Sequence, residues 1–367
     1  MPLSNSSNNY IFVEQKKLNL ISGIMEQLRS IVSEYESDIT KIDQHLEKLF
    51  DSVQADIVNL LLETSYKTGY VTLKDHEYIN DRFIANLNLR WFESFDLLCL
   101  FNIVSYEIAQ NIASNGAIYH TESKKNTFRV LLKLHARSIQ IAQEILVLMK
   151  NGFADGALAR WRTLHELSVI FLFISKNGEE VAQRYSDYYV VEQSKELEAY
   201  NSTAQYLDFE KISEKDQKRI TDSLENLKQK YGDTFVKEYG WARNVITSKK
   251  IHFSELEKLV GLDFLNGFYK WACNPVHAGI KASLFSLGNL DEPNMLFSLA
   301  GASNVGFTDP GQLTAYSLLQ INKALVGCFD SFDNRIAIKV LEIFFEDLKD
   351  RLTATQEAIN NEEASKA

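Results

Sequence analysis

The chain has 367 residues, of which 45% are hydrophobic, including 22 Phe and 16 Tyr, so it can form a large core and is not a disordered chain. Its formal net charge of −10 argues against a surface that coats nucleic acid broadly, although a small basic cleft remains compatible with it. Only 4 prolines and 16 glycines occur, and apolar residues recur at helical spacing rather than in strict alternation. These features predict an all-α protein, a multi-helix bundle with a long N-terminal coiled-coil-like helix.

The cysteines, the N-terminus and the apolar runs bear on the compartment. Cys99, Cys273 and Cys328 form no C-x-x-C pair, so we predict neither a disulfide framework nor a thiolate zinc site, but three buried small residues in a reducing cytosol. The N-terminal stretch lacks the charged start and apolar core of a secretory signal, and the longest apolar runs are too short to span a bilayer. We therefore expect a soluble, cytoplasmic protein without membrane contact.

A Ser/Asn-rich tail at residues 1–10, expected to be disordered, precedes a heptad pattern. One apolar series recurs every seven residues, and a second lies three residues after members of the first, which is the coiled-coil spacing. The first series is Ile11, Leu18, Met25, Val32, Ile39, Leu46, Val53 and Leu60, and the second is Ile21, Leu28, Tyr35, Ile42 and Leu49. The pattern predicts a coiled-coil-like helix over residues 11–64, with its tightest seam between about Leu18 and Val53.

Two interpretations of this helix stay open. It can be an arm that pairs with a second copy, which makes a homo-oligomer through residues 11–64, or it can pack on its own bundle. We favour the arm, because one seam with a 3.5-residue period fits a single partner helix better than a wide core face.

Polar and glycine-containing stretches divide the rest of the chain. A polar break at Lys74–Asn80 separates the N-terminal helix from a helix over about Arg82–Ser114. Asp309-Pro310 is a strong signal for the start of a helix. Asp330–Asn334 is a candidate break between two C-terminal helices. The predicted divisions are a helical connector at 65–127, a helical core domain with the candidate site at 128–290, a loop at 291–308, C-terminal helices at 309–358 and a frayed tail at 359–367.

Several catalytic motifs are absent from the sequence. No glycine precedes a lysine, so there is no Walker A loop, and no G-x-G-x-x-G occurs. Val169 stands where the H-E-x-x-H zinc motif, started by His165-Glu166, needs its second histidine. No E-x-x-H exists for a di-iron site in a bundle. We predict neither a metal nor a cofactor.

The stretch Asn151–Asn177 places ionisable side chains in a helix that is otherwise core material. Arg162 and Glu166 are i, i+4 neighbours, and a buried pair between them would fix the orientation of the helix. Arg160 projects from a different face and makes an R-x4-H spacing with His165. Arginine can hold phosphate and histidine can move protons, so these two residues could cleave RNA with the ribose 2′-hydroxyl as nucleophile. The structural and the catalytic interpretation both stay open.

Other histidines and aromatic residues have similar alternatives. His277 follows Asn274-Pro275 near a predicted helix start and has small neighbours, which suit a ligand or close helix packing. We predict that it lies within one side chain or one water of Glu166 or Arg162, at the rim of a pocket. His135 falls on the apolar stripe of its helix and is expected in the core. Tyr269, with the tryptophans at 241 and 271, could stack on bases, but core packing is the default.

These residues carry a family resemblance. Over about residues 128–287, the chain resembles a bacterial all-helical family of unknown function, whose recurring charged positions match Arg162, Glu166 and His277. The residues that carry it are Gly152, Gly156-Ala157-Leu158, Arg160, Arg162, Glu166-Leu167, Arg184-Tyr185, Tyr188, Trp241, Tyr269 and Pro275-Val276-His277-Ala278. The R-x4-H spacing also resembles the HEPN superfamily, all-α dimers that include RNA-cleaving toxins and phage-defence effectors. Trp161 departs from that pattern, which usually has a polar residue after the arginine.

Two functional hypotheses follow. In a HEPN-like, metal-independent ribonuclease of stress or phage defence, Arg160 or Arg162 would bind the scissile phosphate of an RNA partner. His165 would be the acid and base, oriented by Glu166, with His277 as a second proton-transfer group. The alternative is a non-enzymatic helical dimerisation, interaction or sensor module.

Overall fold

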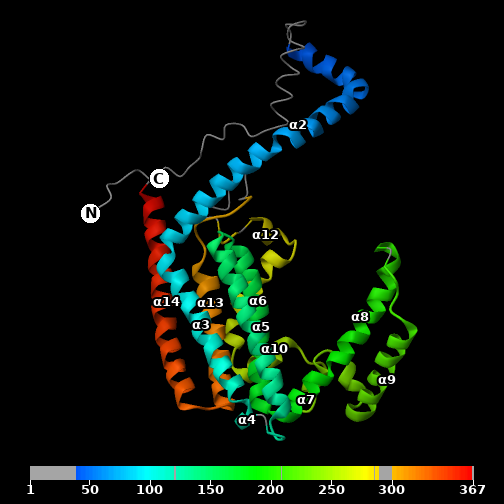
Figure 1. Ribbon diagram of the computed structural model, residues 1–367, viewed down its shortest axis with the longest axis vertical. Helices are drawn as coiled ribbons and strands as arrows, with labels where there is room; N and C mark the ends of the chain where they lie inside the picture. Colours follow the sequence, from blue (N-terminus) through cyan, green and yellow to red (C-terminus); the bar gives the residue numbers. More distant parts are fainter. Residues whose placement is uncertain (1–38, 120, 208, 285, 289–299, 366–367) are drawn as a thin grey trace. The chain divides into compact units, whose positions relative to one another are not determined.

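The computed structural model describes residues 39–119, 121–207, 209–284, 286–288 and 300–365. Every regular element in these ranges is helical, which confirms the predicted all-α class (Figure 1). None of the helices in the described part of the chain is long and apolar enough to cross a bilayer. The chain divides into two units, Met1–Ala85 and Asn86–Ala367, and each is described by itself.

The first unit is described as one helix. Helix α2, Ile39–Arg90, begins in this unit and ends in the second. The polar break predicted at Lys74–Asn80 is wrong, because α2 continues through it. Its residues are compatible with a helix, and an ion pair between Lys74 and Glu77, at 2.6 Å and spacing i, i+3, adds local support. The tail at residues 1–10 and the side chains of the predicted seam, residues 18–53, lie outside what the structure describes.

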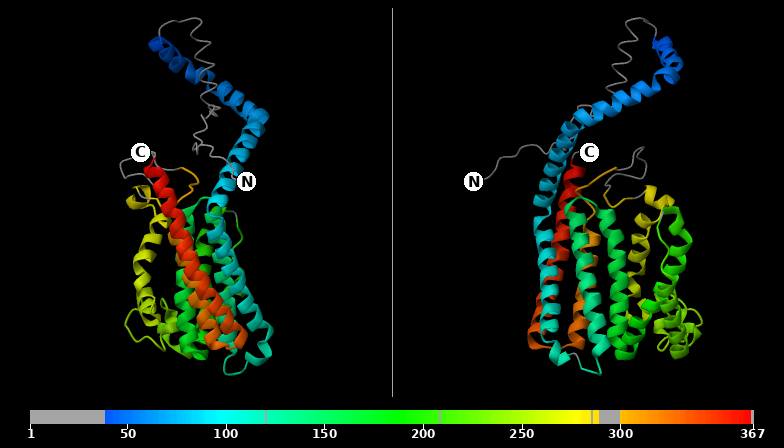
Figure 2. Two further views of the ribbon diagram at one scale, coloured as in Figure 1. Left: turned by 90° about the vertical axis from the view of Figure 1, so that its left-hand side faces the viewer. Right: turned by 45° about the vertical axis from the view of Figure 1, so that its right-hand side comes forward.

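The second unit contains a bundle of long helices that run side by side (Figure 2), as the sequence predicts. Its members are α3 (Phe92–Ser114), α5 (Lys125–Lys150), α6 (Ala154–Asn177), α13 (Thr308–Cys328) and α14 (Phe332–Ala364). Their inner faces carry the apolar side chains that amphipathic helices bury together. The most extensive contacts join α5 with α6, α6 with α13, and α13 with α14, and α6 is the central helix because it also packs against α10 and α11.

The breaks between these helices have identifiable causes. The single helix that was predicted from Arg82 to Ser114 is interrupted at Trp91, whose fully buried indole donates a hydrogen bond to the carbonyl of Asn304 at 2.9 Å. The predicted break after Asp330 is confirmed, and Ser331 caps α14 by accepting from the backbone N–H of Asn334 at 3.2 Å. Helix α14 then continues to Ala364, through most of the tail that was expected to fray.

The core also contains polar groups. His135 is fully buried, as predicted, and its Nε2 lies 3.0 Å from Oδ1 of Asn322. The Asn322 amide in turn donates to the Ser105 hydroxyl at 2.8 Å, so one network ties α5, α13 and α3 together. The three cysteines are free and half-buried rather than fully buried as predicted.

Shorter helices lie along one side of the bundle. Ser213 caps α9 by accepting the backbone N–H of Asp216 at 3.2 Å. The helix start predicted near His277 lies later, at Ile280, because residues 277–279 are not helical. The remaining elements are α4 (Gly116–Tyr119), α7 (Glu179–Asp187), α8 (Tyr189–Thr203), η1 (Ala204–Leu207), α9 (Glu214–Tyr231), η2 (Asp233–Val236), η3 (Gly240–Ala242), α10 (Phe253–Val260), η4 (Asp263–Leu265), α11 (Asn266–Ala272), η5 (Asn274–Val276) and α12 (Ile280–Leu284).

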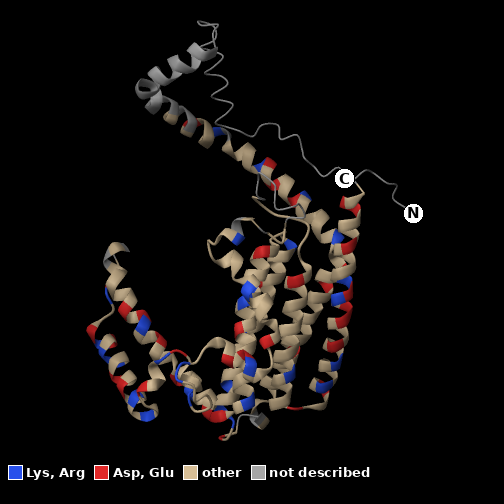
Figure 3. Ribbon diagram, turned by 180° about the vertical axis from the view of Figure 1, so that it is seen from behind, with Lys and Arg blue, Asp and Glu red and all other residues tan. Residues whose placement is uncertain are grey.

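Charged residues of both signs intersperse along these helices in the view of Figure 3. Helix α14 illustrates this, since Lys339 pairs with Glu342 at 2.8 Å and Lys349 pairs with Glu346 at 2.5 Å on its surface. Such exposed pairs contribute little stability individually and keep the local field small.

Candidate functional site

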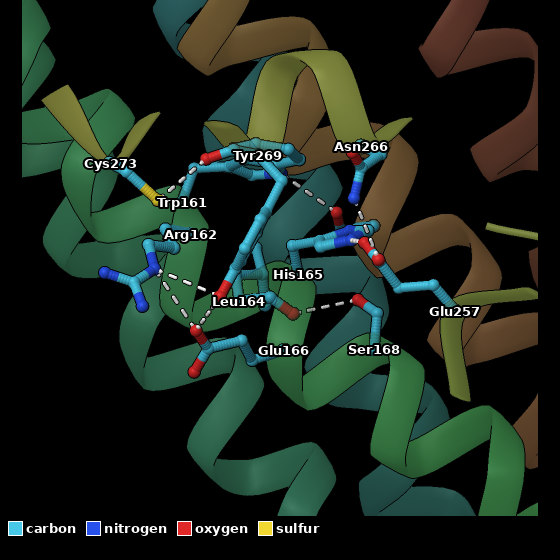
Figure 4. Close-up of polar contacts among 11 residues, drawn as sticks. Trp161, Arg162, Leu164, His165, Glu166, Ser168, Glu257, Asn266, Tyr269 and Cys273 are labelled. Carbon is cyan, nitrogen blue, oxygen red and sulfur yellow. Dashed lines mark hydrogen bonds and ion pairs between the residues drawn. The ribbon is translucent and has the colours of Figure 1, made fainter. Parts of the chain in front are cut away.

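Helix α6 carries four of the five predicted site residues, and α10 and α11 pack against the half of α6 that bears them (Figure 4). Asp155 in its first turn accepts the backbone N–H of Leu287 at 3.0 Å, an arrangement that the helix dipole favours. Gly178 ends the helix with a positive φ of 74°, which a residue with a Cβ rarely adopts. The four side chains therefore sit on a helix that is fixed at both ends.

His165 points into the protein and is 0% exposed. Its Nε2 lies 2.8 Å from Oε1 of Glu257 on α10, whose other carboxylate oxygen accepts from the amide of Asn266 at 3.1 Å. The rings of Trp161 and Tyr269 lie 5.2 and 5.5 Å from the imidazole. Burial lowers the pKa of His165 below 6.5, although the contact with Glu257 acts in the opposite direction. The imidazole is therefore neutral at pH 7 and has no access to solvent.

Arg162 and Glu166 form the ion pair that their spacing predicts, with Nε and Oε1 3.2 Å apart. The Tyr269 hydroxyl joins the pair, since it donates to Glu166 at 2.6 Å and accepts from Arg162 at 3.2 Å. The guanidinium also lies over the Tyr269 ring, 5.2 Å from its centroid. The prediction of a buried pair is wrong, because the side chains of Arg162 and Glu166 are 27% and 36% exposed. The pair lies at the edge of the α6–α11 contact, where water reaches both groups.

These contacts alter the acidity of the groups. Burial and the hydrogen bond to Glu166 raise the pKa of Tyr269 to about 12. The hydrogen bond to Tyr269 raises the pKa of Arg162, while partial burial opposes the effect. The hydroxyl therefore keeps its proton and the guanidinium its charge over the whole physiological range, so neither group can serve as an acid or base near pH 7.

Arg160 lies elsewhere. Its guanidinium pairs with Glu144 on α5 and reaches the Thr163 hydroxyl at 3.5 Å. The R-x4-H spacing therefore does not bring Arg160 and His165 together, because one side chain follows the outer surface of α5 and the other enters the core. An exposed phosphate bound at Arg160 would not reach the His165 imidazole.

His277 also does not join the cluster in the contacts that the structure describes. It is exposed, it follows η5 in an extended conformation, and its backbone N–H donates to Cys273 at 3.2 Å. No hydrogen bond or ion pair between its side chain and Arg162 or Glu166 occurs among the described residues. The polar group that this segment supplies to α6 is the hydroxyl of Tyr269. The described contacts therefore include no direct bond between His277 and the pair, and an approach through one bridging water stays a prediction.

Glu257 and Asn266 were not predicted as site residues from the sequence, and Tyr269 was predicted to stack on bases or to pack in the core. A signal for Glu257 was present, since it stands four residues after Phe253 and beside Leu256 on the apolar stripe of α10, where an acidic residue needs a partner. Nothing in the local sequence identifies that partner as His165. In the described part of the chain, no group of three or more His, Cys, Asp or Glu side chains converges to hold a metal ion.

The family comparison covers this site. Residues 128–295 match the model of a family of unknown function, DUF5677. The DUF5677 match confirms the resemblance predicted over about residues 128–287, and it includes Arg162, Glu166, Glu257 and Tyr269. No curated protein and no solved structure matches the chain. The resemblance to the HEPN superfamily stays a prediction that none of these matches shows.

Proposed function

We propose that the chain is a non-enzymatic helical interaction module that forms homo-oligomers through helix α2. The observation that carries the proposal is a row of exposed apolar side chains on α2. Val58, Leu62, Tyr66, Tyr70 and Leu73 are between 46% and 85% exposed. At about 100° per residue they fall within an arc of roughly 120°, so they share one face of the helix.

The row follows the heptad region along the chain but lies on another face of the helix, since Leu60, the last member of the heptad series, is about 200° from Leu62 at 100° per residue. Its 16 residues, 58–73, extend over roughly 22 Å at the rise of an α-helix. An amphipathic helix gains most of its stability by packing its apolar face, and apolar rows of this kind mark interaction sites on soluble proteins. The same row on two copies is self-complementary about a two-fold axis. A second copy of this chain is therefore the partner that the proposal names.

The geometry of the candidate site supports the non-enzymatic part of the proposal. His165, the proposed acid and base of a ribonuclease, is fully buried and held by Glu257. Arg160 is engaged by Glu144 on a different side of α6. Within the proposal, the polar cluster holds α10 and α11 against α6 and does no chemistry. The cytoplasmic location expected from the cysteines belongs to the same proposal, whereas RNA binding and a role in phage defence gain no support from the matches.

The oligomeric state of the full chain tests the proposal. Leu62→Asp puts a charge in the row and should reduce the mass measured by light scattering, because a buried charge without a partner disfavours the contact. Val71→Asp is the matched control, since Val71 is exposed like Leu62, at 61% against 48%, but projects from the opposite face. An unchanged mass for Leu62→Asp, or a monomeric wild type, contradicts self-association through α2.

A second experiment tests the absence of catalysis. The purified chain is incubated with single-stranded RNA in a metal chelator, and we expect the RNA to stay intact. Cleavage that disappears in Arg160→Ala, with an unchanged melting temperature, would contradict the non-enzymatic proposal. Arg160 suits this test because its side chain runs from α6 along the surface of α5, where it is 26% exposed. Its removal therefore leaves the core unchanged.

A further inference from the structure

We propose that the outer face of α3 and α14 binds the same face of a second copy of this chain, through a contact that is independent of α2. This α3/α14 face consists of seven large apolar residues, each between 46% and 70% exposed. They are Phe92, Leu100, Ile103 and Tyr106 on α3, and Phe332, Ile336 and Ile343 on α14.

On each helix the exposed residues lie opposite the core. The fully buried α3 side chains Leu98 and Phe101 project roughly 135° and roughly 165° away from the centre of the exposed row at 100° per residue. The same holds for α14, where Leu341 and Leu348 enter the core. Both helices are therefore apolar on two opposite sides. An amphipathic surface helix normally carries polar residues on its outer side, so the second apolar side needs its own explanation.

The two rows lie at the same level of the bundle. Helices α3 and α14 are antiparallel neighbours, visible side by side in the left view of Figure 2. Arg351 bonds to Glu93 at 2.5 Å near one end, and Asn111 donates to Asn334 at 3.1 Å near the other. The exposed residues at the centre of each helix, Ile103 and Ile343, lie between these two contacts. The rows thus form one continuous face.

The face has the size of an interface core. The α3 row from Phe92 to Tyr106 is about 21 Å long, and neighbouring helices lie about 8–10 Å apart. The apolar area is therefore roughly 20 Å by 20 Å, close to half of the ~800 Å² that each partner contributes to a standard interface. An apolar core of this size inside a charged rim matches the anatomy of protein interfaces.

The charges around the α3/α14 face favour a second copy whose α3 and α14 run in the opposite direction. Asp347 and Asp350 flank the apolar row near the end where Arg351 meets Glu93, and Asp96 lies at the same end. Arg335 and Lys339 flank the other end, with side chains that are 64% and 73% exposed, and each also pairs with an acidic residue of its own chain, Asp330 or Glu342. Two copies packed in the same direction would bring their acidic ends together. A two-fold axis across the helices instead places each acidic end near the Arg335 and Lys339 of the partner.

Two independent contacts predict assemblies larger than a dimer. We expect the full-length wild type to contain at least four chains by light scattering or native mass spectrometry. Ile343→Asp should leave a dimer held by α2, Leu62→Asp should leave a dimer held by the α3/α14 face, and the double variant should be monomeric. Ile103→Asp, on the other helix of the face, should reproduce the effect of Ile343→Asp. Val147→Asp, a change at 60% exposure on α5 and outside the face, is the control with unchanged mass.

The outcomes separate the two proposals. If Ile343→Asp and Ile103→Asp keep the wild-type mass, the α3/α14 contact is refuted while the α2 contact can stand. If only Leu62→Asp keeps the wild-type mass, the α2 contact is refuted and the face stands. A monomeric wild type refutes both. The relative direction of the two copies has its own test. Lys339→Glu should weaken the assembly, and adding Asp347→Lys in the same chain should restore it. Failure to restore the assembly overturns the opposite-direction arrangement.

Discussion

Nε2 of His165 lies 2.8 Å from Oε1 of Glu257, and both side chains are almost completely buried. A carboxylate can only accept, so Nε2 carries the proton of the neutral imidazole and Nδ1 carries the lone pair. Nδ1 has no hydrogen-bond partner among the described residues. A second proton would therefore place an unpaired charged N–H among aromatic rings, and burial accordingly lowers the pKa of His165. The contact between His165 and Glu257 therefore joins α6 to α10 while the imidazole is neutral.

The first prediction compares two glutamates of the cluster. Glu257→Ala removes the acceptor of a fully buried donor and should reduce the free energy of unfolding by about 3–5 kcal/mol. Glu166→Ala removes a partner that water can replace and should cost about 1 kcal/mol or less. Denaturant unfolding at pH 7 measures both. Glu198→Ala, an exposed position, is the control and should change stability very little.

Equal effects of Glu257→Ala and Glu166→Ala would contradict the buried pair. Glu257→Gln refines the test, because the amide oxygen can still accept from His165 while the Asn266 amide turns to accept from the new NH2 group. We expect this variant to retain more than half of the stability lost in Glu257→Ala.

Local rules were sufficient to predict part of the site. The Arg162–Glu166 pair follows from helical spacing, and the divergence of Arg160 follows from the same geometry. The core position of His135 is also a local property of the sequence. These features depend on residues within one or two turns, where the spacing of an α-helix fixes which side chains meet.

The contacts that the sequence did not predict join distant segments. Glu257 meets His165 because α10 packs on α6, and no pattern within α10 reveals that pairing. The polar stretch near Lys74 suggested a loop, yet polarity alone does not end a helix that contains neither proline nor glycine there. His277 looked like a partner for α6, but η5 ends before it and leaves the imidazole at the surface.

The second prediction concerns acid. Burial lowers the pKa of His135 to about 4, despite its hydrogen bond to Asn322. A group with a lowered folded pKa contributes its full stability above the unfolded value of 6.5, and this contribution is lost as the pH falls toward 4. The loss over that range is about 3 kcal/mol from this residue, and His165 shifts in the same direction. Unfolding curves at pH 7.5 and pH 4.5 measure the difference.

His135→Gln tests the assignment, since glutamine does not titrate and can still bond to Asn322. The variant should be less stable than the wild type at pH 7.5 but should lose clearly less stability on acidification. His76→Gln, a change at an exposed histidine, should keep the wild-type pH dependence. The same dependence in His135→Gln and wild type would assign the acid sensitivity to other groups.

The third prediction concerns a cap made across two helices. Glu179, in the first turn of α7, accepts the backbone N–H groups of Asn126 and Thr127 at the start of α5, each at 2.9 Å. Burial alone would raise the pKa of Glu179, but the N–H and side-chain donors of Thr127 and Asn126 together hold it below its usual value. Glu179→Ala should cost about 1–2 kcal/mol, as the loss of a helix cap does. Glu180→Ala, at the exposed neighbour, should cost much less, and equal losses would show that the cap contributes nothing.

The last prediction concerns a close backbone contact just before α13. There Gly306 lies against Leu287, the residue that Asp155 binds at the start of α6. Gly306 has a φ of 89°, and a Cβ there would lie 2.2 Å from the carbonyl oxygen of Leu287. Leu287 cannot yield easily, because its N–H is held by Asp155 at the start of α6 at 3.0 Å. Gly306→Ala combines an unfavourable φ with a backbone clash and should reduce the free energy of unfolding by at least about 1–3 kcal/mol. Gly301→Ala is the matched control, since a Cβ there meets no atom within 4 Å, and its effect should stay within about 0.5 kcal/mol. If both alanine variants unfold at the same denaturant concentration, the segment around Leu287 is not fixed by Asp155, and the start of α6 lacks the anchor that this contact gives it.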